Sequence, residues 1–304
     1  MNCLEFYLKK TKSQYKSFKG FVCYIDLLGF SSLTNENSQL SNDEIKRKLA
    51  IFHFIIKKQI SRKIYCSVIS DSVFIYSTVS SKVFLTTLAN IFRKCLERGI
   101  LLRAGLDYGD YSVLRTKLYK NNVFGKAVTN AVALEKKGKG CRIFINENFP
   151  SSCKDITSNQ KNLFNQYKNY QDYSNIDVFE WAYINENYIY KANEKDSQTK
   201  PNINLRKLLF SNSKLITLLR FSNFFKENIS SEKGIIQVKS TIEYISSISE
   251  TILKKLNSNI NEEISTECLD LNYMAQVNIF ELIIEKFNLY MSGEYLSIPK
   301  EIQE

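Results

Sequence analysis

The 304-residue chain has a single histidine, His53, and few residues that interrupt regular structure, with three prolines and ten glycines. One histidine excludes any site that needs two or more histidine ligands from one chain, which removes most zinc hydrolases and the facial-triad iron oxygenases. No apolar run reaches the roughly 18 residues that a membrane-spanning helix needs. We therefore expect a protein without a membrane partner, whose chemistry rests on side chains other than histidine.

The seven cysteines form no Cys-x-x-Cys pair, and their number is odd. This pattern argues against a disulfide framework and against a zinc site of paired cysteines. The sequence also shows no basic segment followed by an apolar leader. We expect a reduced, cytoplasmic protein.

Hydrophobic residues make up 44% of the chain and charged residues 24%, which is a globular composition. The length fits a catalytic domain with an appended module, because single cores stop growing at about 250 to 300 residues. The net charge of +11 favours an anionic partner, such as a nucleotide, a nucleic acid or an acidic surface. No aromatic-basic motif of the RRM or zinc-finger type accompanies that charge, so we expect no nucleic-acid partner.

The first part of the chain has the pattern of an α+β fold. Residues 21–30 (FVCYIDLLGF) form an apolar run with one carboxylate, which is typical of a central strand. Apolar residues then recur at helical spacing from Asn42 onward. The predicted order continues with two strands within 63–78 that meet at Ser70 and Asp71, a helix over 80–99 and a strand over 100–108. This βαββαβ order predicts an antiparallel sheet with both helices on one face, the ferredoxin-like arrangement of nucleotide-polymerising palms.

Further elements extend this motif. A third helix is expected over 124–137, and strands over 141–146 (CRIFIN) and 178–184 (VFEWAYI) enlarge the sheet. The predicted organisation is an N-terminal segment 1–19, an α+β domain 20–185, a polar linker 186–204 and an all-helical region 205–304. Three amphipathic segments, 205–226, 235–256 and 269–291, are expected to form a bundle that docks on the domain or on its dimer mate.

Two carboxylates stand out in the predicted sheet. Asp26 lies in the apolar strand, and Asp71 lies at the tip of the hairpin. Either alone would be typical of a turn or a helix cap. Together, at the end of a central strand and the tip of an adjacent hairpin, they can converge on hard divalent cations and leave room for phosphate oxygens.

Four segments in order resemble the class III nucleotidyl cyclases. Residues 24–33 (YIDLLGFSSL) resemble the first-strand motif of that family, in which an aspartate leads into Gly-Phe-Ser/Thr. Residues 69–72 (ISDS) resemble its second metal-aspartate hairpin, 102–109 (LRAGLDYG) its Arg-x-Gly strand, and 125–128 (GKAV) the start of its fourth helix. The resemblance covers about residues 20–185. It is closest to the bacterial pyrimidine cyclases of Pycsar antiphage systems, through the pattern from Gly125 to Glu135.

The resemblance implies conversion of UTP or CTP to the 3′,5′-cyclic monophosphate and pyrophosphate, with two Mg²⁺ or Mn²⁺ ions per site. Asp26 and Asp71 would hold these ions, and the backbone carbonyl of Leu27 would be a further ligand. Attack of the ribose 3′-oxygen on the α-phosphorus needs an activated hydroxyl and neutralised phosphates more than a protein nucleophile. Two metal ions supply both.

Backbone groups after the first strand are expected to bind the phosphates. Gly29 allows a close turn, and the N–H groups of Phe30, Ser31 and Ser32 at a helix start would face the β- and γ-phosphates.

The fourth-helix asparagine and arginine that stabilise the transition state in purine cyclases align with Thr129 and Ala133. Those two roles are therefore not filled by the usual residues. Arg103 is the substitute candidate for neutralising phosphate charge, and its alternative role is a structural ion pair with an acidic residue of the sheet.

The base-reading positions also depart from the purine pattern. The lysine that reads the base in purine-specific cyclases aligns with Ser67. Tyr65, Ser67 and Asp71 share one face by strand alternation, so a hydroxyl or a phenol could face the base. Asn122 aligns with the second base-reading residue and can donate and accept hydrogen bonds, which suits either pyrimidine.

Other residues are expected to be structural. His53 should pack on or beside the apolar stripe of the first helix. Asp107 and Asp110 flank Gly109 and are interpreted as turn residues, and Trp181 as a packing residue.

In the family, metal aspartates come from one chain and base-reading residues from the other, which implies a homodimer with composite active sites. A separate effector protein would detect the cyclic nucleotide in antiphage defence. Two alternatives stay open: a purine cyclase, disfavoured by Ser67, and a catalytically inactive cyclase-like protein that binds nucleotides or a partner, suggested by Thr129 and Ala133.

Overall fold

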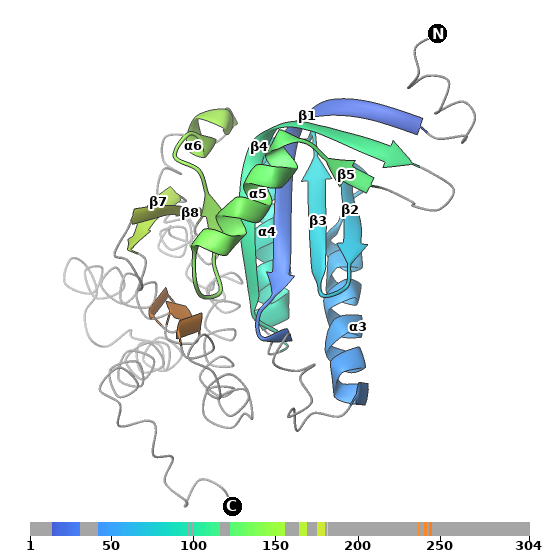
Figure 1. Ribbon diagram of the computed structural model, residues 1–304, viewed down its shortest axis with the longest axis vertical. Helices are drawn as coiled ribbons and strands as arrows, with labels where there is room; N and C mark the ends of the chain where they lie inside the picture. Colours follow the sequence, from blue (N-terminus) through green and yellow to red (C-terminus); the bar gives the residue numbers. More distant parts are fainter. Residues whose placement is uncertain are drawn as a thin grey trace, which may run out of the picture. The chain divides into compact units, whose positions relative to one another are not determined.

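The computed structural model describes residues 14–30, 42–96, 98, 100–115, 122–155, 164–168, 175–179 and 181, together with six residues between 236 and 244 (Figure 1). The chain divides into two compact units, Met1–Trp181 and Ala182–Glu304. The first unit carries the sheet. Of the three predicted C-terminal helical segments, the first and third lie outside the described residues, and the six described residues of the second are helical.

The order of elements in the first unit confirms the predicted α+β class. It begins with β1 (Gln14–Leu27), α3 (Asn42–Gln59), β2 (Ile64–Ile69), β3 (Ser72–Ser77), α4 (Ser81–Leu96) and β4 (Leu102–Arg115). It continues with β5 (Asn122–Phe124), α5 (Lys126–Lys137), β6 (Ile143–Ile145), α6 (Phe149–Ser152), β7 (Phe164–Lys168) and β8 (Asn175–Phe179). None of the helices in this described part of the chain is both long and apolar enough to cross a membrane.

The described strands form one sheet in the order β2-β3-β1-β4-β6-β8-β7, with β5 added to β4. The central strand β1 is antiparallel to β3 and to β4, and β4 is parallel to β6. The register places Asp26 opposite Ser72 of β3 and opposite Arg103 of β4. The end of β1 therefore lies between the β2–β3 turn and the start of β4.

The two faces of the sheet are covered by different helices (Figure 1). On one face Phe21 of β1 stacks on Phe84 of α4, with ring centroids 5.2 Å apart. On the other face Val22 packs in a cluster with Ala127 and Ala131 of α5. Because side chains alternate along a strand, Tyr24 and Asp26 lie on the α5 face with Val22. The carboxylate of Asp26 thus belongs to the face that carries α5.

A glycine allows α5 to approach β4 closely. A Cβ atom added at Gly105 would lie 1.9 Å from the carbonyl oxygen of Ala131 and 2.5 Å from the backbone nitrogen of Glu135. Only a residue without a side chain fits between the strand and the helix backbone. This contact fixes the position of α5 over Arg103 and Asp107, which share the face of Gly105.

The structure differs from the sequence-based prediction at the strand ends. β1 begins at Gln14 and β4 ends at Arg115, well beyond the predicted runs 21–30 and 100–108. The added halves pair with each other, from Gln14 opposite Arg115 to Gly20 opposite Gly109, and they add Phe18, Tyr111 and Val113 to the hydrophobic cluster that contains Ala127. Strands β5 and β7 were not predicted either. The packing role of Trp181 is confirmed, since it is 1% exposed, its ring contacts Phe92 and its indole N–H donates to the Cys141 carbonyl at 3.0 Å.

Candidate active site

The two predicted metal aspartates lie at the same end of the sheet. Asp26 is the second-last residue of β1, and its partner Ser72 on β3 directly follows Asp71 in the β2–β3 turn. The turn depends on Ser70, which adopts a left-handed backbone conformation with φ of 53°. Asp26 is half-buried. Burial raises its pKa to about 7, repulsion by Glu135 and Asp71 adds to this, and the Arg103 guanidinium opposes it.

Two carboxylates are enough to bind a divalent cation whose remaining ligands are phosphate oxygens and water. Within the described residues no group of three or more histidine, cysteine, aspartate or glutamate side chains could hold a metal ion on its own. Mg²⁺ in phosphate-transferring sites is usually held by only one or two carboxylates, with the other positions taken by water and substrate oxygens. A half-buried carboxylate that is repelled by a neighbouring one is a favourable place for a cation.

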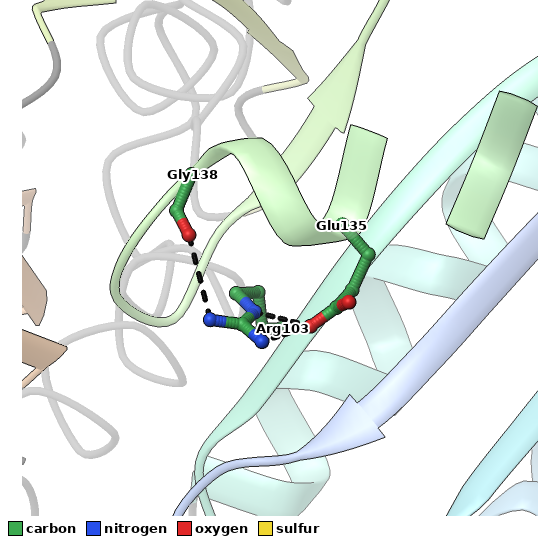
Figure 2. Close-up of polar contacts among 3 residues, drawn as sticks. All are labelled: Arg103, Glu135 and Gly138. Atoms are coloured by element: carbon green, nitrogen blue, oxygen red, sulfur yellow. Dashed lines mark hydrogen bonds and ion pairs between the residues drawn. The ribbon is translucent and has the colours of Figure 1, made fainter. Parts of the chain in front are cut away.

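Arg103 is held by a buried ion pair with Glu135 of α5 (Figure 2). Its Nε and Nη2 both reach Oε1 of Glu135, and its Nη1 donates to the carbonyl of Gly138 at 3.4 Å. The side chains of Arg103 and Glu135 are 14% and 4% exposed. The expected ion-pair partner is therefore present, but it lies on a helix and not in the sheet.

Tyr65 and Ser67 lie on β2, and both side chains contact Tyr76 of β3. Tyr65 is 45% exposed and stacks on Tyr76 with ring centroids 6.0 Å apart. The half-buried Ser67 is hydrogen-bonded to the Tyr76 side chain. Asn122 is exposed on β5, opposite Leu114 of β4.

Part of the predicted phosphate-binding turn is described. Gly29 has φ of 81°, a conformation that favours glycine, so the chain turns sharply after β1 as expected. The N–H of Leu28 donates to the Leu101 carbonyl at 2.9 Å, which fixes the start of that turn to the sheet. Phe30 is described, and Ser31 and Ser32 lie outside the described residues.

A polar cluster beneath α5 was missed by the sequence reasoning. Asp107 is 4% exposed in the middle of β4, and Asp110 lies in the same strand opposite Lys19, so the interpretation of both as turn residues is wrong. The carboxylate of Asp107 accepts a hydrogen bond from Nδ2 of Asn130 at 2.9 Å and another from Nδ2 of Asn146. Strand alternation from Arg103 through Gly105 could have placed Asp107 on the α5 face. The cluster ties α5 and the segment after β6 to the central strands.

The two α5 positions that align with transition-state residues are exposed. Thr129 donates its hydroxyl to the Gly125 carbonyl at 3.2 Å, within its own helix, and Ala133 has no polar group. Neither supplies a charge to the site.

No family model and no curated protein matches the chain. Solved structures with a similar arrangement include the guanylyl cyclase Cya2, at 14% identity over 54% of this chain and 91% of that chain, with a TM-score of 0.42. The adenylyl cyclase CyaB from P. aeruginosa is 16% identical over 55% and 94% of the two chains, with a TM-score of 0.42. The dimeric guanylyl cyclase domain of the RhoGC fusion protein from Blastocladiella emersonii is 16% identical over 55% and 97%, with a TM-score of 0.43. Identities this low concern the fold alone, and the activity is argued from the residues of the site.

Proposed function

We propose that this protein is a nucleotidyl cyclase that converts UTP or CTP to the 3′,5′-cyclic monophosphate and pyrophosphate. The observation that carries the proposal is the convergence of Asp26 and Asp71 at one end of the sheet, where Asp26 interacts electrostatically with Asp71 and with Arg103. The order of the four cyclase-like sequence motifs supports it. The reaction needs no protein nucleophile, and none of the described histidine or cysteine side chains is required for it.

Asp26 and Asp71 would bind Mg²⁺ or Mn²⁺, with the Leu27 carbonyl as a further ligand by resemblance. When bound, two such ions lower the pKa of the ribose 3′-hydroxyl and neutralise the triphosphate. With a pKa of about 7, the Asp26 carboxyl would be protonated in about half of the metal-free molecules at neutral pH. Binding of a metal ion by Asp26 would require the ionised carboxylate and would release this proton.

The turn after β1 would orient the triphosphate. Gly29 bends the chain so that the following N–H groups of Phe30, Ser31 and Ser32 can face phosphate oxygens. The sequence-based expectation for Arg103 is that it neutralises phosphate charge. Its ion pair with Glu135 makes the structural role the better supported one, since most of its donors are already used within the chain.

The pyrimidine preference rests on β2 and β3. Ser67 occupies the position of the purine-reading lysine, and a serine offers no cation to a purine ring. Its hydroxyl is hydrogen-bonded to Tyr76. The exposed ring of Tyr65 is available for stacking on a base. A purine cyclase would have to recognise its base with other groups.

The resemblance further supports a homodimer in which each site takes its aspartates from one protomer and its base-reading residues from the partner. In that assembly the product would serve antiphage defence through a separate effector. The competing proposal is an inactive nucleotide-binding relative, and Thr129 and Ala133 on α5 favour it because neither carries the amide or the charge of the asparagine and arginine that they replace.

One assay tests these proposals. Purified full-length protein is incubated with each of the four ribonucleoside triphosphates and Mg²⁺ or Mn²⁺, and products are identified by mass spectrometry. We expect cyclic UMP or cyclic CMP. Asp26→Ala and Asp71→Ala should each reduce product by at least about 100-fold, whereas Asp110→Ala, which removes an exposed carboxylate of β4, should not. Cyclic AMP or cyclic GMP as the main product would establish the purine alternative, and metal-dependent turnover that survives the loss of Asp26 or Asp71 would refute the site.

A further inference from the structure

The face of the first unit that carries α3 and α4 is strongly basic. Residues 45–63 contain seven lysine and arginine residues and no aspartate or glutamate. The carboxylates of α3, Asp43 and Glu44, lie in its first turn, before this run. α4 adds three further cations and no acidic residue. The two helices contact each other and cover the face of the sheet opposite α5, so together with the loop after α3 they form one basic layer (Figure 1).

The cations at the end of α3 lie far from the two aspartates of the proposed active site. Lys63 directly precedes β2, and Asp71 lies in the turn after the other end of that strand. A strand of this length spans about 20 Å, because each residue advances the chain by about 3.3 Å. Asp26 is paired with Ser72, so it lies at the Asp71 end. Binding of substrate phosphates therefore does not account for the charge of this part of the basic layer.

An aromatic ring lies among the exposed cations of α3. Phe54 is 59% exposed, and Arg47, Lys57 and Lys58 are also exposed. Residues three, four and seven positions apart share one side of a helix, so these four side chains form a single surface. The ammonium group of Lys58 lies 5.6 Å from the centre of the Phe54 ring. The outer surface of α3 therefore combines positive charge with an apolar group.

We propose that the basic layer docks this protein on the surface of a bilayer that contains anionic phospholipids. Clusters of about four to eight lysine and arginine residues on a helix bind such surfaces, and each cation near the surface strengthens binding by about fivefold. The lysine ammonium groups can contact lipid phosphates while their alkyl stems and the Phe54 ring lie against the apolar boundary. Duplex nucleic acid also offers phosphates to the cations, but its backbone gives no apolar surroundings to an exposed ring. Charge and the exposed ring together favour the bilayer.

The contact is peripheral and needs no membrane-spanning helix, so it departs from the sequence-based expectation of a protein without a membrane partner. It does not depend on the proposed function, because the residues involved lie outside the proposed active site. Docking through α3 and α4 would direct the opposite face of the sheet, which carries α5 and Asp26, away from the lipid. A nucleotide could then reach that face from solution.

Binding of the full-length protein to vesicles tests the proposal. Sedimentation is measured with vesicles of phosphatidylcholine alone and with vesicles that also contain about 30% phosphatidylserine. We expect binding to the anionic vesicles to be at least about tenfold tighter than to the neutral ones, and to weaken as the ionic strength is raised from about 0.05 to about 0.3 M. A DNA duplex of about 20 base pairs is titrated under the same conditions as the competing anionic ligand.

Two double variants with the same change in charge locate the contact. Lys57→Gln/Lys58→Gln should weaken binding to anionic vesicles at least about tenfold, whereas Lys136→Gln/Lys137→Gln, at the exposed end of α5, should leave it within about twofold. Phe54→Ser should weaken it at least about threefold, because binding scales with the apolar area that enters the interface. Circular dichroism checks that each variant is folded. Absence of binding to anionic vesicles, with or without binding to the duplex, would overturn the proposal. Equal binding to neutral vesicles, equal losses in the two double variants, or an unchanged affinity in Phe54→Ser would overturn it as well.

Discussion

Removing one partner of the Arg103–Glu135 ion pair is expected to lower the free energy of unfolding of the first unit by several kcal/mol. Glu135 is buried and Arg103 is largely buried, at 4% and 14% exposure, so solvent screens the pair weakly. Leaving one charge of a buried pair unpaired costs about 3 to 5 kcal/mol, whereas replacing both charges by apolar groups is often neutral. Arg103→Met should be the more damaging change, because it leaves the more deeply buried Glu135 carboxylate facing Asp26 without a cation.

A double-mutant cycle measures this pair. Arg103→Met, Glu135→Met and the double variant are unfolded in urea, and the fluorescence of Trp181 reports on the first unit because it is the one tryptophan of the chain and is 1% exposed. The double variant should be more stable than either single variant, with a coupling energy of at least about 2 kcal/mol.

The exposed ion pair of α3 is the matched control. Lys46 and Asp43 are 3.3 Å apart but 76% and 90% exposed, so Lys46→Met should leave the unfolding curve unchanged within error. A coupling energy below about 1 kcal/mol for Arg103 and Glu135, the range of exposed pairs, would refute the view that this pair fastens α5 to β4.

Two further predictions concern β4 and β1. Gly105→Ala should lower the free energy of unfolding by at least about 2 kcal/mol, because the new Cβ would overlap α5 backbone atoms. Gly109→Ala should be tolerated, because its Cβ would make only ordinary contacts, at 3.5 Å with the Ala127 side chain and at 3.9 Å with Oδ2 of Asp107; equal urea midpoints for the two variants would contradict this. Asp26 has its pKa raised to about 7, so the folded state holds the proton more tightly than the unfolded state and stability should fall as pH rises from about 4 to 7 and then level off. Asp26→Asn should flatten that part of the melting-temperature profile and be more stable than the parent protein at pH 8; an unchanged slope would show that Asp26 is not the group responsible.

The local sequence pattern was sufficient to predict features that depend on a single helix or hairpin. The apolar stripe of α4 predicted Phe84, Leu88 and Ile91 as buried residues, and all three are fully buried. The hairpin at Ser70 and Asp71 is also where it was predicted, since a β-branched run broken by turn residues has few alternatives. These features depend on spacing within a short window.

The rest depends on contacts between distant segments. The added halves of β1 and β4 interleave apolar residues with several charged ones, such as Lys16, Lys19 and Asp110, so their pattern alone does not distinguish them from loops. They are strands because they pair with each other. The partner of Arg103 and the burial of Asp107 follow from the docking of α5 on β4, which no local pattern encodes. The proximity of Asp26 and Asp71 was predictable, because Asp26 lies at the end of the central strand and Asp71 lies at the tip of the neighbouring hairpin. Their roles as metal ligands stay predictions.

The pairing of β1 with β4 sets the order in which the site can form during synthesis. β1 is made first and can pair with β3 as soon as the hairpin has emerged, which already brings Asp26 beside the β2–β3 turn. Its second partner spans Leu102–Arg115, and Glu135 is made later still. Long-range pairing of this kind slows folding, because the chain loses conformational entropy on closing the loop before the stabilising contacts form. A nascent chain that ends before β4 therefore has Asp26 and Asp71 without the opposing charge of Arg103, and Glu135, the partner of Arg103, is added only when α5 has been synthesised.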